Sequence, residues 1–280
     1  MKIYRKISEV REAVADLKSR GRVGLVTTMG ALHAGHISLI TQALKANDFV
    51  VATIFVNPTQ FENPKDLETY PRTETEDIAR LRDAGVSAVF IPKTDEIYPE
   101  GSETIVNTTR LSNIFHGKVR PGHYEGVATV VTKLFNIIGP HAAYFGEKDY
   151  QQLAVIKRMV QDLHMPIQIY GVKTVRESDG LALSSRNVRL SPKDRQAAPV
   201  LHQSLLAADK VISKGGTIED AKAALKACIE AEPRATLKAA DFVDAASFDV
   251  ATGIPTGKIG VMLSVQFSDI LLIDQKEISV

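Results

Sequence analysis

Residues 27–36 read Thr-Thr-Met-Gly-Ala-Leu-His-Ala-Gly-His and combine two glycines with two histidines three positions apart. The segment follows an apolar run at 23–26 and precedes an amphipathic run at 37–46, the order of a buried strand, a tight turn and a helix N-terminus. Glycines let the backbone turn sharply and let a ligand approach it closely. A helix N-terminus attracts anions through unpaired N–H groups and its dipole. The imidazoles of His33 and His36 at such a terminus favour phosphate chemistry on a nucleotide.

Two other interpretations of the histidine pair are a metal site and a solvated turn. Zinc-binding helices of the His-Glu-x-x-His type carry their histidines four positions apart on one face, with a glutamate beside the first. Here the spacing is three, a glycine intervenes and no glutamate follows His33. This argues against a metal pair, while phosphate binding and an ordinary polar turn both stay open on this motif alone.

Composition narrows the classes of protein. With 280 residues, 44% hydrophobic and 24% charged, the chain is typical of a folded protein of one or two domains. The net charge of +1 and the 6% aromatic content favour neither nucleic acid nor an anionic membrane as partner. Its one cysteine, Cys228, lies in an Ala-rich helical run and suits a reducing compartment. Without a signal-like N-terminal apolar run or a membrane-length apolar stretch, we expect a cytoplasmic protein.

Strand-like and helix-like segments alternate through residues 1–174. The run at 49–56 is apolar at nearly every position, which indicates a strand buried on both faces, as in a parallel sheet. The alternation predicts an α/β fold with a Rossmann-like doubly wound parallel sheet. Strands are expected at 22–27, 49–56, 86–91, 142–145 and 167–172, a shorter one at 104–106, and helices at 36–46, 74–84, 127–138 and 150–163.

A second, smaller domain is expected at 175–280. Two Ala-, Leu- and Lys-rich helical segments, at 192–214 and 218–231, precede three strand-like runs. Helices followed by strands predict an α+β domain. We expect this domain to close over the active site.

Polar residues gather where the expected strands end. Asn57 and Gln60 follow the apolar strand at 49–56, at the edge where open α/β sheets bind ligands; a simple turn before Pro58 is the alternative. Lys148 stands at a helix start, where a cation is unfavourable unless it faces an anion. Arg120 lies in a turn and is either a surface residue or a clamp on a carboxylate or phosphate.

Two further polar groups have an ordinary and a functional interpretation. The Ser-Ser-Arg-Asn segment at 184–187 is either a helix cap or a mobile flap that brings donors onto phosphates. Asp77 lies in the first turn of a helix, where capping electrostatics explains it adequately. A magnesium role for Asp77 has no support in the sequence.

Seven segments in this order resemble the pantothenate synthetase (pantoate–β-alanine ligase) family. The resemblance runs from about residue 23 to 190 and is looser over the remaining residues. Any one segment is a weak motif, whereas the ordered set is highly specific. The segments are residues 28–36, 54–61, 67–73, 120–124, 145–152, 174–181 and 184–187.

The resemblance implies a nucleotidylyltransferase-type Rossmann fold and a two-step, ATP-dependent reaction. The carboxylate of pantoate attacks the α-phosphorus of ATP to give pantoyl adenylate and pyrophosphate. The amine of β-alanine then attacks the mixed anhydride and releases AMP and pantothenate. Mg²⁺ accompanies ATP as cofactor, and members of the family are usually homodimers.

The resemblance also implies roles for residues that match its motifs. The catalytic, phosphate-facing set is His33, His36, Lys148, Ser184, Ser185 and Arg186. Further nucleotide contacts are implied for Met29, Gly30, Gly146, Asp149, Val175 and Leu183. Pantoate contacts are implied for Met29, Asn57, Gln60, Arg120 and Gln152. The Mg²⁺ ligands stay unassigned.

The chain departs from the family pattern at positions outside this polar set. Thr27 stands where the family usually has proline, which loosens the turn because proline fixes φ. Leu183 replaces methionine with little change in volume. The segment 269–274 lacks an arginine common in the family.

Two rival functions can be stated. A nucleotidylyltransferase acting on another small acid or a phosphorylated substrate would share the histidine turn, but the neutral amides of Asn57, Gln60 and Gln152 suit hydroxyls and one carboxylate better than a phosphomonoester. A non-catalytic nucleotide-binding regulator would not need the full set of phosphate-facing cations.

Overall fold

The computed structural model describes residues 1–62 and 64–280, and the chain divides into two compact units. The N-terminal unit comprises Met1–Gly146 and Gln151–Lys173. The C-terminal unit comprises Glu147–Tyr150 and Thr174–Val280. Within the described residues, no helix is both long and apolar enough to cross a membrane.

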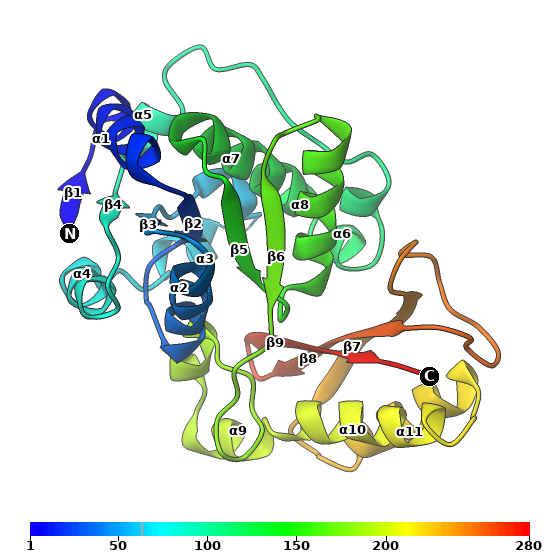
Figure 1. Cartoon of the computed structure of the whole chain (residues 1–280). Helices are drawn as coiled ribbons and strands as arrows, with labels where there is room; N and C mark the ends of the chain where they lie inside the picture. Colours follow the sequence, from blue (N-terminus) through cyan, green and yellow to red (C-terminus); the bar gives the residue numbers. More distant parts are fainter. Residues whose placement is uncertain (63) are drawn as a thin grey trace. The chain divides into compact units, whose positions relative to one another are not determined.

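The N-terminal unit is built on a six-stranded parallel sheet in the order β1-β4-β3-β2-β5-β6 (Figure 1). Neighbouring residues Val50 and Val51 are both 0% exposed, so both faces of the sheet are covered. The expected Rossmann-like fold is thus confirmed. The strands are β1 (Lys2–Tyr4), β2 (Val23–Thr28), β3 (Phe49–Ile54), β4 (Ala88–Phe90), β5 (Ala142–Gly146) and β6 (Gln168–Val172).

Helices connect the parallel strands. The longer ones are α1 (Ile7–Arg20), α2 (Ala34–Ala46), α4 (Glu74–Asp83), α7 (His123–Ile138) and α8 (Tyr150–Asp162). Helix α2 packs on β2 and β5, and α1 packs on α7. Short helical turns fill the longer connections: η1 (Pro58–Gln60), α3 (Pro64–Glu68), α5 (Thr94–Ile97), η2 (Leu111–Asn113) and α6 (His116–Val119).

Two strands differ from expectation. Residues 104–106 form no strand; there the Val106 backbone exchanges hydrogen bonds with the Thr129 hydroxyl instead of a strand neighbour. Strand β1 was not expected because it has only 3 residues. It exists because it pairs with β4 at the edge of the sheet, a tertiary contact with no local signal.

The C-terminal unit packs two helices on a three-stranded antiparallel sheet, β7-β8-β9. The expected helix at 192–214 is divided into α9 and α10 around Ala198 and Pro199. The last strand-like run, expected at 270–273, is longer in the structure: β9 continues through polar residues because its pairing with β8 extends to Ile278. The elements are η3 (Ser185–Arg189), α9 (Pro192–Ala197), α10 (Val200–Ile212), α11 (Ile218–Glu230), β7 (Thr236–Asp244), β8 (Ile259–Phe267) and β9 (Ile270–Ile278).

Candidate active site

The segment from the end of β2 into the first turn of α2, which we call the histidine turn (residues 29–36), has an unusual backbone conformation. Gly30 and Ala31 both have positive φ, 81° and 49°. A Cβ on Gly30 would lie 3.0 Å from Oδ2 of Asp77 and 3.3 Å from Ile54. Glycine is therefore required at position 30 both for its conformation and for the close approach of a carboxylate.

The carboxylate of Asp77, in α4, fills the concavity formed by this backbone. The N–H of Ala31 donates to its Oδ2 at 2.9 Å, and the N–H of Leu32 donates to its Oδ1 at 2.8 Å. The Thr73 hydroxyl adds a third bond at 3.1 Å, and Asp77 is only 1% exposed. Successive N–H groups in left-handed conformations form anion-binding sites. Here the anion is the protein's own carboxylate, so these donors are not left for a ligand.

A second contact from α4 completes the hold on the turn. The Arg80 guanidinium donates to the carbonyl oxygen of Leu32, the same residue whose N–H meets Asp77. Residues 77 and 80 are three apart on the helix and so share one face. Sequence reasoning missed this function of Asp77, and its place in the first turn of α4 explains only part of its role.

His33 and His36 cap the start of α2 with one nitrogen each. Nδ1 of His33 accepts from the N–H of Gly35 at 3.1 Å, and Nδ1 of His36 accepts from the N–H of His33 at 3.2 Å. The ring centroids are 4.1 Å apart. A neutral imidazole whose Nδ1 accepts carries its proton on Nε2. Each ring therefore carries a donor at Nε2, while the N–H groups of His33 and Gly35 are bonded within the turn.

The amides of Asn57 and Gln60 lie together after β3. Asn57 Nδ2 donates to Gln60 Oε1 and to the carbonyl of Gly126, each at 3.2 Å. Its Oδ1 accepts from the hydroxyls of Thr59 at 3.1 Å and Tyr98 at 2.9 Å. Asn57 is 1% exposed and fully engaged. Because it binds the oxygen of Gln60, it fixes the orientation of that side chain with the NH₂ group as the donor left for a ligand.

Arg120 is joined to this pair through His123. The carbonyl of Gln60 lies 2.9 Å from Nδ1 of His123, and Nε2 of His123 lies 3.3 Å from the Arg120 guanidinium. Since a guanidinium only donates, Nε2 accepts and Nδ1–H donates to Gln60. The structure therefore brings together Asn57, Gln60 and Arg120. His123 is the residue that links Arg120 to Gln60.

The histidine turn and the amide cluster follow neighbouring strands. Thr28 at the end of β2 is paired with Ile54 at the end of β3, and the Phe55 N–H donates to the Thr28 carbonyl at 3.0 Å. Both groups of side chains therefore begin at the same carboxyl edge of the sheet, where ligands bind in open α/β folds.

The other predicted residues of the N-terminal unit have simpler surroundings. Met29, Gly146 and Gln152 are each half-buried. The adjacent Gln151 is 1% exposed and structural, because its amide bonds the carbonyls of Leu111 and Ile114, both at 2.8 Å, and the N–H of His116.

In the C-terminal unit, the Ser184 hydroxyl caps η3 by accepting the N–H of Arg186 at 3.3 Å. Lys148, Ser184, Asn187 and Asp274 line one small pocket together with apolar side chains. Val175 and Leu183 lie opposite one another, with the Leu183 N–H donating to the Val175 carbonyl at 3.0 Å. Asp149 and Ser185 lie outside the lining of this pocket, and both have other partners.

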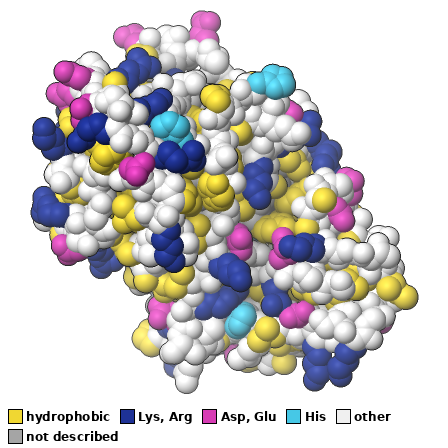
Figure 2. All heavy atoms as spheres, in the orientation of Figure 1, with side chains coloured by type: hydrophobic (Ala, Val, Ile, Leu, Met, Phe, Trp, Pro, Cys, Tyr) yellow, Lys and Arg dark blue, Asp and Glu magenta, His cyan; other side chains and the backbone are white. Residues whose placement is uncertain are grey.

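Charges of both signs are interspersed over the face displayed in Figure 2. That pattern agrees with the net charge of +1. Within residues 1–62 and 64–280, no group of three or more His, Cys, Asp or Glu side chains is arranged to hold a metal ion.

Comparison with known proteins identifies close relatives. The model of the pantoate-beta-alanine ligase family matches residues 2–277. The pantothenate synthetase of Acetivibrio thermocellus is 45% identical over 277 residues, covering 98% of each chain. The crystal structure of pantothenate synthetase from Thermus thermophilus has a TM-score of 0.95 at 43% identity, covering 100% of both chains. Pantoate-beta-alanine ligase from Francisella tularensis, complexed with beta-gamma ATP and beta-alanine, has a TM-score of 0.81 at 35% identity, covering 99% of this chain and 97% of that one.

The contacts of Asp77 predict a local effect of its substitution. In Asp77→Asn one backbone N–H of the turn faces an NH₂ group and loses its acceptor. The unpaired donor should lower the stability of the turn by about 1–3 kcal/mol. Hydrogen exchange should show faster exchange of the Ala31 and Leu32 amides. Asp83→Asn, which removes an exposed carboxylate from the same helix, is the matched control and should leave both amides protected. Unchanged protection in Asp77→Asn would contradict the assigned contacts.

Proposed function

The chain belongs to the pantoate–β-alanine ligase family and catalyses the ATP-dependent ligation of pantoate with β-alanine, and we propose that it does so through an enzyme-bound pantoyl adenylate. The observation that supports this most directly is the pair of imidazole Nε2–H donors at the sheet edge, beside an amide cluster suited to a carboxylate and hydroxyls. The imidazole donors suit phosphate oxygens, and the amide cluster suits the carboxylic acid that attacks.

In the first step a carboxylate oxygen of pantoate bonds to the α-phosphorus of ATP, and the bond from that phosphorus to the pyrophosphate oxygen breaks. Two anions must meet, so the barrier comes largely from repulsion and lost freedom. Donors fixed in place before the reaction lower that barrier. His33 and His36 donate to phosphate oxygens as pyrophosphate leaves, and their capping bonds hold both rings in position.

In the second step the amine of β-alanine attacks the acyl carbon of the adenylate. The carbon–nitrogen bond forms, the carbon–oxygen bond to AMP breaks, and the amine loses a proton to solvent. No covalent bond to the protein is needed. This agrees with Cys228, whose thiol pKa is raised by burial, so the reactive thiolate is disfavoured.

Pantoate is held by the amide cluster. Gln60 donates to its carboxylate or hydroxyl oxygens, Asn57 fixes the orientation of Gln60, and Arg120 closes the carboxylate end through its link to His123. Met29 supplies apolar contact and Gln152 a further amide. The Tyr98 hydroxyl donates to Asn57, and burial raises its pKa, which further disfavours the phenolate that could not donate.

ATP is bound by residues of both parts of the chain. Lys148, Ser184, Ser185 and Arg186 hold its phosphates. The nucleoside is contacted by Gly30, Gly146, Asp149, Val175 and Leu183. In this proposal residues 1–174 bind ATP and pantoate, and residues 175–280 close over them.

Mg²⁺ enters with ATP. Sites of this kind hold the ion mainly through substrate phosphates and water, with one or two carboxylates at most. Asp77 does not fit that role, because both of its oxygens accept buried backbone N–H groups. The homodimer and the cytoplasmic location implied by the family resemblance stay predictions.

Oxygen transfer tests the adenylate intermediate. Pantoate labelled with ¹⁸O in its carboxylate should deliver one labelled oxygen to AMP, because the bond that breaks in the second step leaves that oxygen on phosphorus. Mass spectrometry of AMP and pantothenate measures the transfer. Pantothenate formed with unlabelled AMP would contradict the intermediate.

Replacement of His36 tests the role of the imidazole donors. His36→Ala should lower adenylate formation at least about 100-fold, the scale of losing one transition-state donor. His36→Asn separates capping from catalysis, because its amide oxygen can still accept the His33 N–H while the Nε2–H is lost. Both variants should be folded by circular dichroism, and single-turnover kinetics should show slow adenylate formation in both. A near-native rate in His36→Asn would show that His36 acts only as a cap.

A further inference from the structure

A short hairpin precedes the Ser-Ser-Arg segment in the C-terminal unit. Arg176 and Ala182 form a bridge, and the Glu177 N–H donates to the Leu181 carbonyl at 2.8 Å. Gly180 turns the hairpin with φ 94°. The Asn187 amide then donates to the Ala182 carbonyl at 3.0 Å, which ties η3 back to the hairpin. The conformation of the hairpin therefore sets the position of Ser184 and the residues after it.

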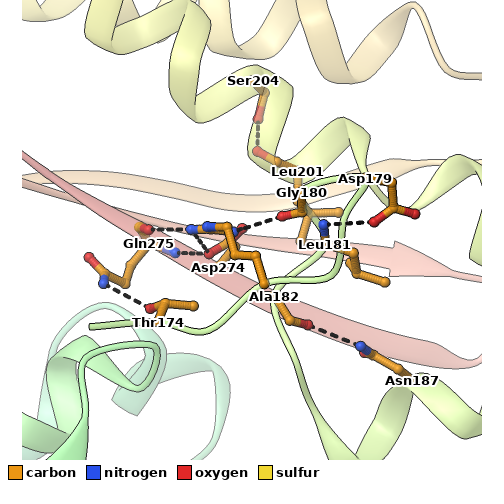
Figure 3. A network of polar contacts seen from close by, with 11 residues as sticks. Thr174, Asp179, Gly180, Leu181, Ala182, Asn187, Leu201, Ser204, Asp274 and Gln275 are labelled. Atoms are coloured by element: carbon orange, nitrogen blue, oxygen red, sulfur yellow. Dashed lines mark hydrogen bonds and ion pairs between the residues drawn. The ribbon is translucent and has the colours of Figure 1, made fainter. Parts of the chain in front are cut away.

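The hairpin is fixed to β9 by a bidentate ion pair. The guanidinium of Arg176 donates to Asp274 Oδ2 at 2.6 Å and Oδ1 at 2.9 Å. It also donates to the carbonyl of Gly180 at 3.1 Å and to that of Gln275 at 3.3 Å. Asp274 and Gln275 of β9 and Gly180 of the hairpin meet in this network (Figure 3). One side chain thus joins the tip of the hairpin to the sheet.

The ion pair also neutralises the charge of a buried carboxylate. The Asp274 side chain is 1% exposed and lines the same pocket as Lys148 and Ser184. A buried carboxylate beside a phosphate site opposes the ligand unless a cation neutralises it. Arg176 is that cation, and its planar fork matches both carboxylate oxygens as lysine cannot.

The His202 ring lies next to the hairpin turn and close enough to Arg176 to be affected by its charge. The pKa of His202 lies below its usual range, first through burial and then through the nearby Arg176 cation. A Cβ on Gly180 would come within 2.6 Å of the His202 ring. The imidazole that packs on the hairpin turn is therefore neutral. It does not compete with Arg176 as a cationic partner of the Asp274 carboxylate.

We propose that Arg176 and Asp274 are positioning residues for ATP. Their ion pair holds the hairpin that leads to Ser184–Arg186 and cancels a negative charge beside Lys148 and Ser184. The inference rests on the proposed phosphate-binding role of that segment. Neither residue needs to touch the nucleotide.

A charge-removal series tests this. Arg176→Gln leaves Asp274 uncompensated and should raise the KM for ATP at least about tenfold, the scale of a lost charge-assisted bond. Adding Asp274→Asn removes the uncompensated charge, so the double variant should recover to within about threefold of the native KM, with the KM for pantoate unchanged throughout. Arg234→Gln, which breaks the ion pair with the buried Asp194 elsewhere in this unit, is the control and should leave the KM for ATP unchanged.

The outcomes separate this inference from the proposed function. An unchanged KM for ATP in Arg176→Gln, a double variant no better than the single one, or parallel loss of pantoate affinity would overturn the inference. If Arg176→Gln does not fold, Arg176→Lys decides: it keeps the cation but loses the fork, so the KM for ATP should rise at least about threefold, and an unchanged value overturns the inference. Native protein that forms no AMP with pantoate, ATP and β-alanine together would instead overturn the proposed function.

Discussion

The carboxylate of Asp77 is the group on which the conformation of the histidine turn depends. It holds a turn whose Ala31 has a positive φ of 49°, a conformation that costs about 1–3 kcal/mol. Two backbone N–H groups donate to the carboxylate, and hydrogen bonds to a charged group contribute about 1.5–3 kcal/mol each. The free energy gained from the two hydrogen bonds is therefore at least as large as the cost of the strained backbone. These bonds hold the backbone that leads from the end of β2 to His33 and His36 at the start of α2.

In the proposed function, the two units contribute different kinds of donor. The N-terminal unit offers imidazole and amide donors whose orientation is fixed by buried partners, as Asn57 fixes Gln60. The C-terminal unit offers Lys148 and the segment at 184–186, beside a carboxylate already neutralised by Arg176. The amide donors suit the acid that must attack, whereas the imidazole donors and the cations suit phosphates. Membership of the ligase family decides against the regulator hypothesis.

The sequence predicted what periodicity and local motifs encode. Continuous apolar runs such as residues 49–56 predicted the parallel sheet, which is confirmed, and the glycines marked the histidine turn. Periodicity did not reveal β1, because an edge strand of 3 residues depends on its partner β4. The polar ends of strands drew attention to Asn57 and Gln60, and the structure joins these two side chains.

Long-range contacts lay beyond such reasoning. Asp77 meets Ala31 across 46 positions and Arg176 meets Asp274 across 98, so neither partner is visible in a local pattern. An acidic residue in a first helical turn has an adequate local explanation, which conceals the tertiary one. The protonated nitrogen of each imidazole likewise follows only from its hydrogen bonds, not from residue type.

Pantoate-dependent exchange between ATP and labelled pyrophosphate, measured without β-alanine, tests the central claim most directly. If the acid attacks the α-phosphorus to form a bound adenylate, label should enter ATP when pantoate is present and stop when it is omitted. Folded protein that binds ATP but shows no exchange with pantoate would contradict adenylation as the first step.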